Sequence, residues 1–192
     1  MSVQIRPLAL PGVLEIVPRR FGDDRGVFCE TWSAESFREA GLDLDFVQDN
    51  HSVSTARGVV RGLHYQLPPH AQDKLVRVVR GAIFDVAVDI RSDSPSFGKW
   101  VGIELSADKW NQLLVPKGYA HGFQTLEPDT EVLYKVSNYY SPGHEISMLW
   151  NDPALAIDWP SGGSEPILSP RDEAGLRIAE IPPVFEYAGA MT

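Results

Sequence analysis

Three side chains that can carry chemistry lie close together in one stretch of the sequence. Residues 61–66 read Arg-Gly-Leu-His-Tyr-Gln, and Lys74 follows in the next apolar segment. A second histidine, His121, closes the segment 116–121, which reads Pro-Lys-Gly-Tyr-Ala-His. Histidine is a common metal ligand and also the side chain whose pKa best suits proton transfer near neutral pH. The spacing therefore allows a metal site or proton transfer at carbon, and the neighbouring residues decide between them.

The residues around the two histidines disfavour a metal site. A cupin metal centre commonly uses the pattern H-x-H, a glutamate a few residues on, and a distant histidine after P-x-G. Here Gln66 takes the place of the second histidine, and an amide is a poor ligand for a transition metal. The next strongly polar residue is Lys74, whose ammonium would repel a metal ion. His64 and His121 without a carboxylate partner make a weak site.

The same residues suit the removal of a proton from carbon beside a ketone. This reaction needs a base with a pKa near neutral and a group that stabilises the enolate oxygen. His64 fits the base, and the Lys74 ammonium offers a positive charge for the oxygen. Inversion also needs an acid on the opposite face of the carbon, and Tyr134 shares a strand face with apolar residues in the segment 132–136. Each of these residues also has a purely structural explanation. His64 can be a hydrogen-bonded core histidine, Lys74 a solvated lysine and Tyr134 a core tyrosine.

The elements around these residues are predicted to be β-strands. Large apolar residues occupy alternate positions in residues 83–91, 101–105 and 132–136, as in strands that bury one face. Arg80-Gly81 reads as a tight turn between two strands. The 16 glycines and 15 prolines are scattered as turn residues, without a linker between two halves. This pattern predicts an all-β sandwich or jelly roll in a single domain over residues 1–192.

Two short helices are predicted beside the strands. Ser33 can cap the first helix, which Gly41 would stop. Ser169 can cap the second, with Pro170 in its first turn and Asp172 at the capping-box position. Asp172 can therefore be explained as a helix cap as well as a functional carboxylate.

Arg61 and His64 pose a geometric problem. In an unbroken strand, the two side chains would point to opposite faces of the sheet. Gly62 lies between them, and glycine permits a bulge or a bend. We therefore expect an irregularity at Gly62 that turns both side chains toward one cavity.

Composition and charge exclude several classes of protein. The 192 residues carry a formal net charge of -9, and the pI is about 5.0. No run of lysine and arginine appears, which argues against a nucleic-acid partner. The single cysteine, Cys29, cannot form an internal disulfide, as expected in a reducing compartment. No apolar stretch has the length of a signal peptide core or a membrane span, so we expect a cytoplasmic protein with no membrane partner.

Taken together, the motifs resemble those of the dTDP-4-dehydrorhamnose 3,5-epimerase family of sugar-nucleotide enzymes. The resemblance runs from about Gly12 to Asp172 and covers most of the chain. Its motifs lie at residues 21–30, 48–52, 61–66, 72–76, 85–91, 97–100, 116–123, 134–135, 140–145, 150–153 and 168–172. One motif alone, such as P-x-G-x-x-H, would be weak, whereas so many in order are not expected by chance.

The resemblance implies a cupin-like jelly-roll barrel that forms a homodimer and needs no metal or organic cofactor. It implies epimerisation at C3 and C5 of dTDP-4-dehydro-6-deoxy-D-glucose, which gives dTDP-4-dehydro-L-rhamnose. His64 would be the base, Asp172 its partner and Tyr134 the acid. Lys74 would face the C4 oxygen, and Tyr140 would stack on the thymine. The positions that hold the sugar nucleotide correspond to Arg25, Glu30, Gln48, Asn50, Arg61, Lys74, His121, Tyr140, Glu145 and Arg171.

The family's dimer exchanges N-terminal segments, here about residues 1–50, so some of these contacts would cross between subunits. Residues from about 173 to 192 would form a C-terminal tail. Three alternatives stay open: an epimerase that acts at C3 or C5 alone on a related dTDP-4-keto-6-deoxy sugar, a metal-dependent cupin enzyme, and a sugar-nucleotide sensor without catalysis. Gln66 and Lys74 argue against the metal enzyme, and a base with an acid argues against the sensor.

Overall fold

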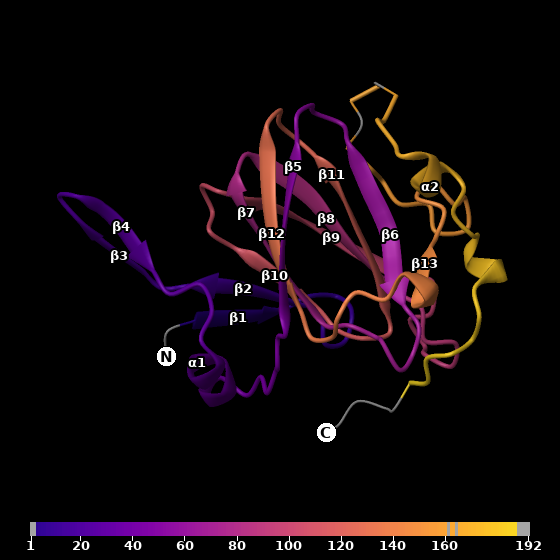
Figure 1. Ribbon diagram of the computed structural model, residues 1–192, viewed down its shortest axis with the longest axis horizontal. Coiled ribbons are helices and arrows are strands. Elements are labelled where there is room, and N and C mark those ends of the chain that lie inside the picture. The colour runs from indigo at the N-terminus through magenta and orange to yellow at the C-terminus, as the bar shows by residue number, and fades with distance from the viewer. Residues whose placement is uncertain (1–2, 161, 164, 188–192) are drawn as a thin grey trace.

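Two antiparallel β-sheets face each other and form the centre of the protein (Figure 1). The computed structural model describes residues 3–160, 162–163 and 165–187. The six-stranded sheet has the order β1 (Val3–Pro7), β2 (Leu14–Pro18), β10 (Gln112–Val115), β7 (Lys74–Arg80), β12 (Thr130–Val136) and β5 (Gln48–Ser54). The five-stranded sheet has the order β13 (Glu145–Ser147), β6 (Val60–Gln66), β11 (Tyr119–Thr125), β8 (Ala82–Asp89) and β9 (Trp100–Ser106). The predicted all-β jelly roll is confirmed.

The main core fills the space between the two sheets. Val76, Leu113 and Val132 reach into it from the six-stranded sheet. Ile83 and Phe123 meet them from the five-stranded sheet. Each large apolar side chain buried in this way stabilises the fold by about 1.5–3 kcal/mol relative to leaving it exposed. The three segments in which alternation predicted strands form β8, β9 and β12, so those predictions are confirmed.

The alternation predicted one buried face for residues 83–91, but the strand β8 is buried on both faces. Val86 and Val88 belong to a second apolar cluster, on the outer face of the five-stranded sheet. Ala87 belongs to the main core, and Asp85 shares its side of the strand because side chains alternate. β7 and β8 meet at the expected turn at Gly81, but they lie in different sheets, so this turn carries the chain from one sheet to the other.

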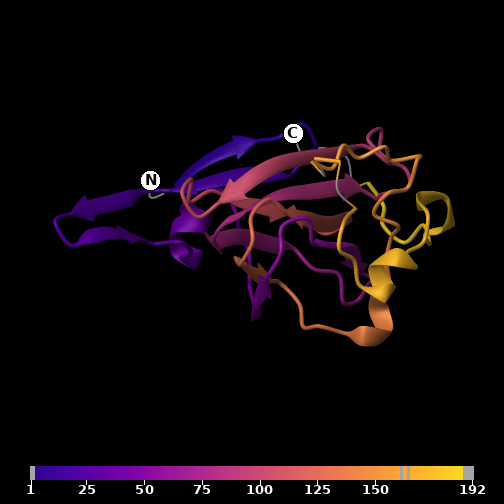
Figure 2. The ribbon, with the colours of Figure 1, turned by 90° about the horizontal axis from the view of Figure 1, so that it is seen from above.

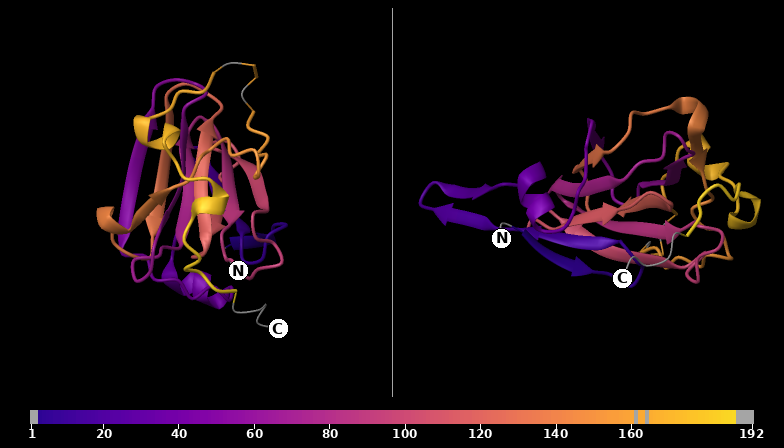
Figure 3. Two further views of the ribbon diagram at one scale, coloured as in Figure 1. Left: turned by 90° about the vertical axis from the view of Figure 1, so that its right-hand side faces the viewer. Right: turned by 90° about the horizontal axis from the view of Figure 1, so that it is seen from below.

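Short helices and irregular segments cover the outer faces of both sheets. The helix α1 (Ala34–Glu39) places Phe37 against Ile16 on the six-stranded sheet. Ser33 Oγ accepts a hydrogen bond from Ser36 N at 3.3 Å, so the predicted cap is confirmed. The later part of the chain crosses the five-stranded sheet and includes η1 (Pro142–His144), α2 (Pro170–Glu173) and η2 (Ile178–Glu180) (Figure 3).

The described part of the C-terminal tail packs against this sheet. Ser92 N donates to Phe185 O at 3.2 Å, and Tyr187 N donates to Asp93 Oδ1 at 2.5 Å. The rings of Phe185 and Tyr65 meet edge to face, with centroids 6.0 Å apart. The remainder of the expected tail, residues 188–192, lies outside the described residues. No helix in the described ranges is long and apolar enough to cross a membrane.

A two-stranded hairpin projects from one end of the molecule (Figures 1 and 2). It consists of β3 (Arg20–Asp23) and β4 (Gly26–Cys29), which pair only with each other among the named strands. Its apolar side chains are unusually open to solvent in the single chain: Phe21 is 49% exposed, Val27 54% and Phe28 70%. Hydrophobic residues gathered on a projecting arm are typical of a surface that packs against another protein.

The irregularity expected at Gly62 is present. The pairing of β11 with β6 shifts register between His121, which is opposite His64, and Phe123, which is opposite Arg61. Gly62 has a φ of 115°, and a Cβ there would lie 2.6 Å from the Cα of Gly122. Only glycine fits this close approach of two strands. The bulge lets Arg61 and His64 reach the same cleft.

Candidate active site

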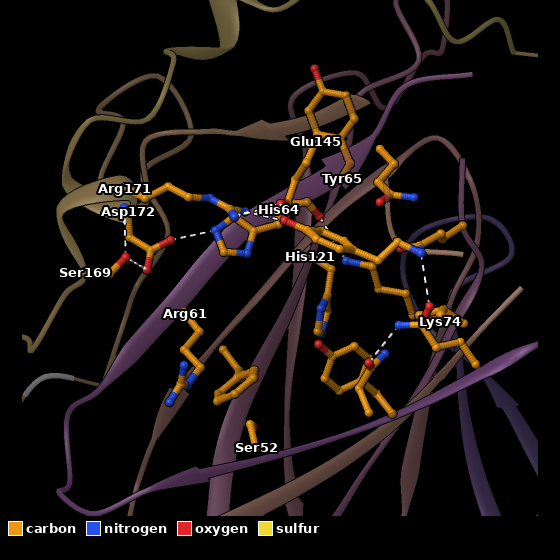
Figure 4. Close-up of a pocket in the computed structure, with 18 residues that line it drawn as sticks. Ser52, Arg61, His64, Tyr65, Lys74, His121, Glu145, Ser169, Arg171 and Asp172 are labelled. Carbon is orange, nitrogen blue, oxygen red and sulfur yellow. Dashed lines mark hydrogen bonds and ion pairs between the residues drawn. The ribbon is translucent and has the colours of Figure 1, made fainter. Parts of the chain in front are cut away.

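A cleft of about 480 Å³ opens between the two sheets, within the size range of small-molecule sites. Its walls come from strands of both sheets and from α2. Figure 4 draws the side chains that line it. They are Gln48, Asn50, Ser52, Arg61, His64, Tyr65, Gln66, Gln72, Lys74, His121, Phe123, Tyr134, Val136, Tyr140, Glu145, Ser169, Arg171 and Asp172.

His64 and Asp172 form a close pair in this cleft (Figure 4). His64 Nε2, from β6, lies 2.6 Å from Asp172 Oδ1, from α2. The Asp172 side chain is only 5% exposed. Because Nε2 faces the carboxylate, Nδ1 is the ring nitrogen that remains for a substrate. The contact between these two residues that the sequence suggested is therefore present.

The surroundings set the protonation of this pair. Burial lowers the pKa of His64 below its ordinary value, and the hydrogen bond with Asp172 only partly opposes this effect. Burial alone would raise the pKa of Asp172, but hydrogen bonds with His64 and Ser169 bring it below its ordinary value. At neutral pH the pair is a neutral imidazole beside an ionised carboxylate, which is the resting state of a general base.

Asp172 serves its helix and His64 at the same time. Its main-chain N donates to Ser169 Oγ at 3.2 Å, so the predicted cap of α2 is confirmed. Ser169 Oγ in turn donates to Asp172 Oδ2 at 2.7 Å. In a full capping box the acidic side chain would reach back to the cap's own N–H. Here Oδ1 turns to His64 instead, so the end of the helix fixes the carboxylate that orients the ring.

Lys74 begins β7 and reaches across the cleft to the strand of His64. Its Nζ donates to the main-chain O of His64 at 3.1 Å. Burial lowers the pKa of Lys74 to about 8, and the negative charges of Glu145 and Asp85 partly oppose this effect. The ammonium therefore remains mostly charged at neutral pH, in surroundings where a charge acts more strongly than in water.

Tyr134 lies on β12, in the sheet that faces the sheet of His64. Its ring packs against the main core, as its position in the alternation predicted, and also lines the cleft. Burial, and next the negative charge of Glu145, raise the pKa of the Tyr134 phenol above its ordinary value. The phenol is thus protonated at neutral pH, and a group between the sheets would have His64 on one side and Tyr134 on the other.

Two arginines and a glutamate also line the cleft. Glu145 Oε2 accepts hydrogen bonds from Tyr140 Oη and from Arg171 Nη1, both at 2.7 Å. Arg61 Nε donates to Ser54 Oγ at 3.2 Å. These contacts fix the planes of the two guanidinium groups, and a guanidinium is well suited to bind an anionic group such as a phosphate. Glu145 pairs with both terminal nitrogens of Arg171, so an anion would share this arginine with the carboxylate.

His121 has a carboxylate partner that the sequence did not reveal. His121 Nε2 lies 2.6 Å from Asp85 Oδ1, and the side chains are 8% and 0% exposed. His121 lines the cleft and is directly opposite His64 across β6 and β11. Asp85 lies within residues 83–91, for which alternation predicted a strand, but only the pairing of β8 with β11 brings it to His121.

Most of the predicted site residues meet in the cleft, and two do not. Gln48 and Asn50 lie on β5, where Gln48 Nε2 donates to Asn50 Oδ1 at 2.8 Å. Arg25 lies at the turn of the hairpin and pairs with Asp23 at 2.5 Å. Glu30 follows the hairpin and accepts from Ser36 Oγ at 2.8 Å. Within one chain, Arg25 and Glu30 are therefore apart from the other predicted residues.

Several lining residues were not among the predicted site residues. They are Ser52, Tyr65, Gln66, Gln72, Phe123, Val136 and Ser169. Ser52 follows the same alternation as Gln48 and Asn50 on β5, so that spacing could have pointed to it. Gln66 uses its amide on main-chain groups of nearby loops. In the described residues no group of three or more His, Cys, Asp or Glu side chains is placed to hold a metal ion.

Comparison with known proteins places this chain in a family. The family model described as dTDP-4-dehydrorhamnose 3,5-epimerase matches residues 7–180. A protein of that name from Escherichia coli K12 is 53% identical over 170 residues, which are 88% of this chain and 91% of that protein.

Solved structures agree. A crystal structure of dTDP-4-dehydrorhamnose 3,5-epimerase from Bacillus anthracis, with TDP and PPi bound, superposes with a TM-score of 0.87 at 49% identity, covering 91% of this chain and 98% of that one. The dTDP-6-deoxy-D-glucose-3,5-epimerase from Legionella pneumophila, in complex with dTDP-4-keto-L-rhamnose, superposes with a TM-score of 0.92 at 43% identity, covering 97% and 100%. The chain therefore belongs to the dTDP-4-dehydrorhamnose 3,5-epimerase family.

Proposed function

We propose that this protein converts dTDP-4-dehydro-6-deoxy-D-glucose to dTDP-4-dehydro-L-rhamnose in the biosynthesis of dTDP-rhamnose. It is an isomerase that inverts C3 and C5, the two carbons beside the C4 ketone. The observation that carries the proposal is one cleft shared by the His64–Asp172 pair, the Lys74 ammonium and the Tyr134 phenol. The names of its relatives, at about half identity over most of the chain, agree with this reaction.

His64 removes the proton from the substrate. Protons at C3 and C5 are acidic because each carbanion is an enolate of the C4 ketone. Nδ1 takes the proton, while Asp172 holds Nε2 and stabilises the imidazolium that forms. Support for this role comes from the lowered pKa of His64, which keeps the ring neutral before the reaction.

Lys74 stabilises the oxygen that gains charge as the proton leaves. Its ammonium lies beside the strand that carries His64, so the same substrate carbonyl can meet the charge while its neighbouring carbon meets the base. This interaction strengthens as the enolate forms, and it therefore lowers the barrier rather than only binding the substrate.

Tyr134 returns a proton to the opposite face of the sugar ring. It belongs to the sheet that faces His64, so a ring held between the sheets is open to one residue on each side. Removal from one face and return to the other inverts the carbon. The same two residues act at C3 and at C5 when the ring presents each carbon in turn, after His64 has passed its proton to solvent and Tyr134 has regained one.

The nucleotide binds through the remaining residues of the cleft. Arg61 and Arg171 take the diphosphate, and Tyr140 stacks on the thymine. Gln48, Asn50, His121 and Glu145 complete the pocket for the sugar nucleotide. The acidic protein can bind an acidic ligand because these guanidinium groups act at short range, whereas distant charges are screened.

The protein acts as a homodimer in the cytoplasm. The hairpin of one subunit brings Arg25 and Glu30 to the cleft of the other, and Phe21, Val27 and Phe28 are covered in the dimer. This proposal is supported by the exposure of these three side chains and by the distance of the hairpin from the barrel (Figure 2). The free cysteine Cys29 agrees with a reducing compartment.

Deuterium uptake tests the reaction. When the purified protein turns over the 4-keto substrate in buffered D2O, we expect deuterium at both C3 and C5 and a product that a downstream reductase accepts. Exchange at only one carbon would show a single-carbon epimerase. No exchange at either carbon despite tight binding of dTDP would show a sensor, and activity lost with a stoichiometric metal under chelator would show a metal enzyme.

Mixed dimers test whether Arg25 acts in the partner's cleft. The Arg25→Ala variant should raise KM about tenfold, because it loses a charged contact to the nucleotide. The His64→Ala variant should be inactive. A heterodimer of the two variants would contain one cleft with both native residues, so mixing should restore activity with the native KM. If Arg25 acted within its own subunit, no cleft would be intact and mixing would restore nothing.

A further inference from the structure

Gln66 ties the strand of the base to two loops at the rim of the cleft. Its side chain is buried, with 4% of the residue exposed, and it follows His64 by two positions on β6. Nε2 donates to His70 O at 2.7 Å and to Tyr139 O at 3.1 Å. Oε1 accepts from Ser141 N at 2.8 Å. A single amide thus joins three backbone groups around residues 70 and 139–141.

Neighbouring polar side chains hold the same loop from other directions. Gln72 Nε2 donates to Asn138 O at 2.8 Å, and Asn138 Nδ2 donates to Pro69 O at 2.9 Å. Tyr140 N donates to Gln48 Oε1 at 3.0 Å. The loop is therefore fixed by hydrogen bonds from side chains rather than by the ladder of a sheet.

This loop has little apolar burial of its own. Tyr139 is 64% exposed and Tyr140 is 51% exposed. Tyr140 lies between the two backbone groups that Gln66 holds, and its hydroxyl donates to Glu145 Oε2 at 2.7 Å. Because few apolar contacts fix the loop, the buried amide has a large share in setting where Tyr140 and Glu145 lie.

We propose that Gln66 is a positioning residue for nucleotide binding. It holds the segment 139–141 in the conformation in which Tyr140 and Glu145 can meet the nucleotide, and it takes no part in proton transfer. This inference rests on the proposed function, which assigns the nucleotide to that end of the cleft. Gln66, two residues after His64, therefore serves nucleotide recognition at the rim of the cleft.

Affinity for dTDP is the direct test of Gln66. We expect the Gln66→Ala variant to bind dTDP about tenfold more weakly by calorimetry, because the loop must be ordered on binding. At saturating substrate, the rate of deuterium uptake should stay within about threefold of the native rate, because His64, Asp172 and Lys74 are untouched. The main-chain amide of Ser141 should exchange faster with solvent, since it loses its acceptor.

The Gln124→Ala variant is a matched control for Gln66→Ala, because it leaves a cavity of the same size at another buried glutamine. Gln124 lies on β11, 1% exposed, outside the cleft, and its side-chain amide has no hydrogen-bond partner among the described residues. The Gln124→Ala variant should keep the native affinity for dTDP and the native exchange of Ser141. An equal loss of affinity in both variants would assign the effect to destabilisation and overturn the proposal.

The Gln66→Glu variant separates the acceptor function of the amide from its donor function. A carboxylate of the same shape can accept from Ser141 N but cannot donate to His70 O and Tyr139 O. This variant also replaces Gln66→Ala if Gln66→Ala does not fold. We expect slow exchange at Ser141 together with weaker dTDP binding. Native affinity for dTDP in either Gln66 variant would overturn the proposal, as would a fall in kcat larger than the loss of affinity. Absence of turnover by the native protein would count against the proposed function instead.

Discussion

Replacing His64 with alanine should lower deuterium uptake at both C3 and C5 by about a thousandfold or more. The imidazole is the only base that the proposed mechanism uses at both carbons, so both rates should fall together. Binding of dTDP should change by less than about threefold, because the nucleotide meets other residues of the cleft. Exchange in D2O followed by NMR measures the two carbons separately, and calorimetry measures the binding.

The Tyr134→Phe variant is the natural partner of this experiment. It removes one hydroxyl and keeps the ring that packs against the main core. Exchange with solvent should continue through His64, while formation of the inverted product should fall about a hundredfold. Equal loss of exchange and inversion in Tyr134→Phe would count against this tyrosine as the acid. Exchange at one carbon that survives in His64→Ala would require a second base, for which His121 with Asp85 is the nearest candidate.

Replacing Lys74 with methionine should lower kcat by about a hundredfold to a thousandfold with a smaller change in KM. Methionine fills a similar volume without the charge, so the enolate oxygen loses its stabilising ammonium in a site with little solvent. Steady-state kinetics with the 4-keto substrate separate the two constants. A rise in KM with kcat unchanged would show that Lys74 only binds the substrate.

The pH dependence of kcat/KM should be bell-shaped, with its alkaline limb set by Lys74. His64 must be neutral, and its pKa is lowered, so activity should fall only well on the acid side of neutral. Lys74 must be charged, and its pKa is about 8, so activity should decline as the pH rises through that value. In the Lys74→Arg variant the cation persists, and the alkaline limb should move upward. An alkaline limb that stays near 8 in Lys74→Met would belong to another group.

Local patterns predicted much of the fold and the central residues of the site. The alternation of apolar residues predicted the strands β8, β9 and β12, and the capping serines predicted the helices α1 and α2. Both predictions succeeded because each signal depends only on residues a few positions apart. The conflict between the faces of Arg61 and His64 predicted the bulge at Gly62. The strand face predicted for Tyr134 and the charge of Lys74, close after His64 in the sequence, also pointed to two residues that line the cleft.

Contacts between distant strands could not be predicted from the sequence. Asp85 looked like one of several polar residues on its strand until pairing with β11 brought it to His121. The hydrogen bonds of Gln66 depend on where two loops fold back, and no local pattern encodes that. Arg25 and Glu30 lie outside the cleft of their own chain. The proposed contact of these two residues with the nucleotide depends on a second chain.

The His64–Asp172 pair joins residues that are 108 positions apart in the chain. During synthesis the imidazole therefore leaves the ribosome before its carboxylate, and the base gains its orienting partner only once α2 has docked beside β6. Arg171, the neighbour of Asp172, enters the cleft in the same step.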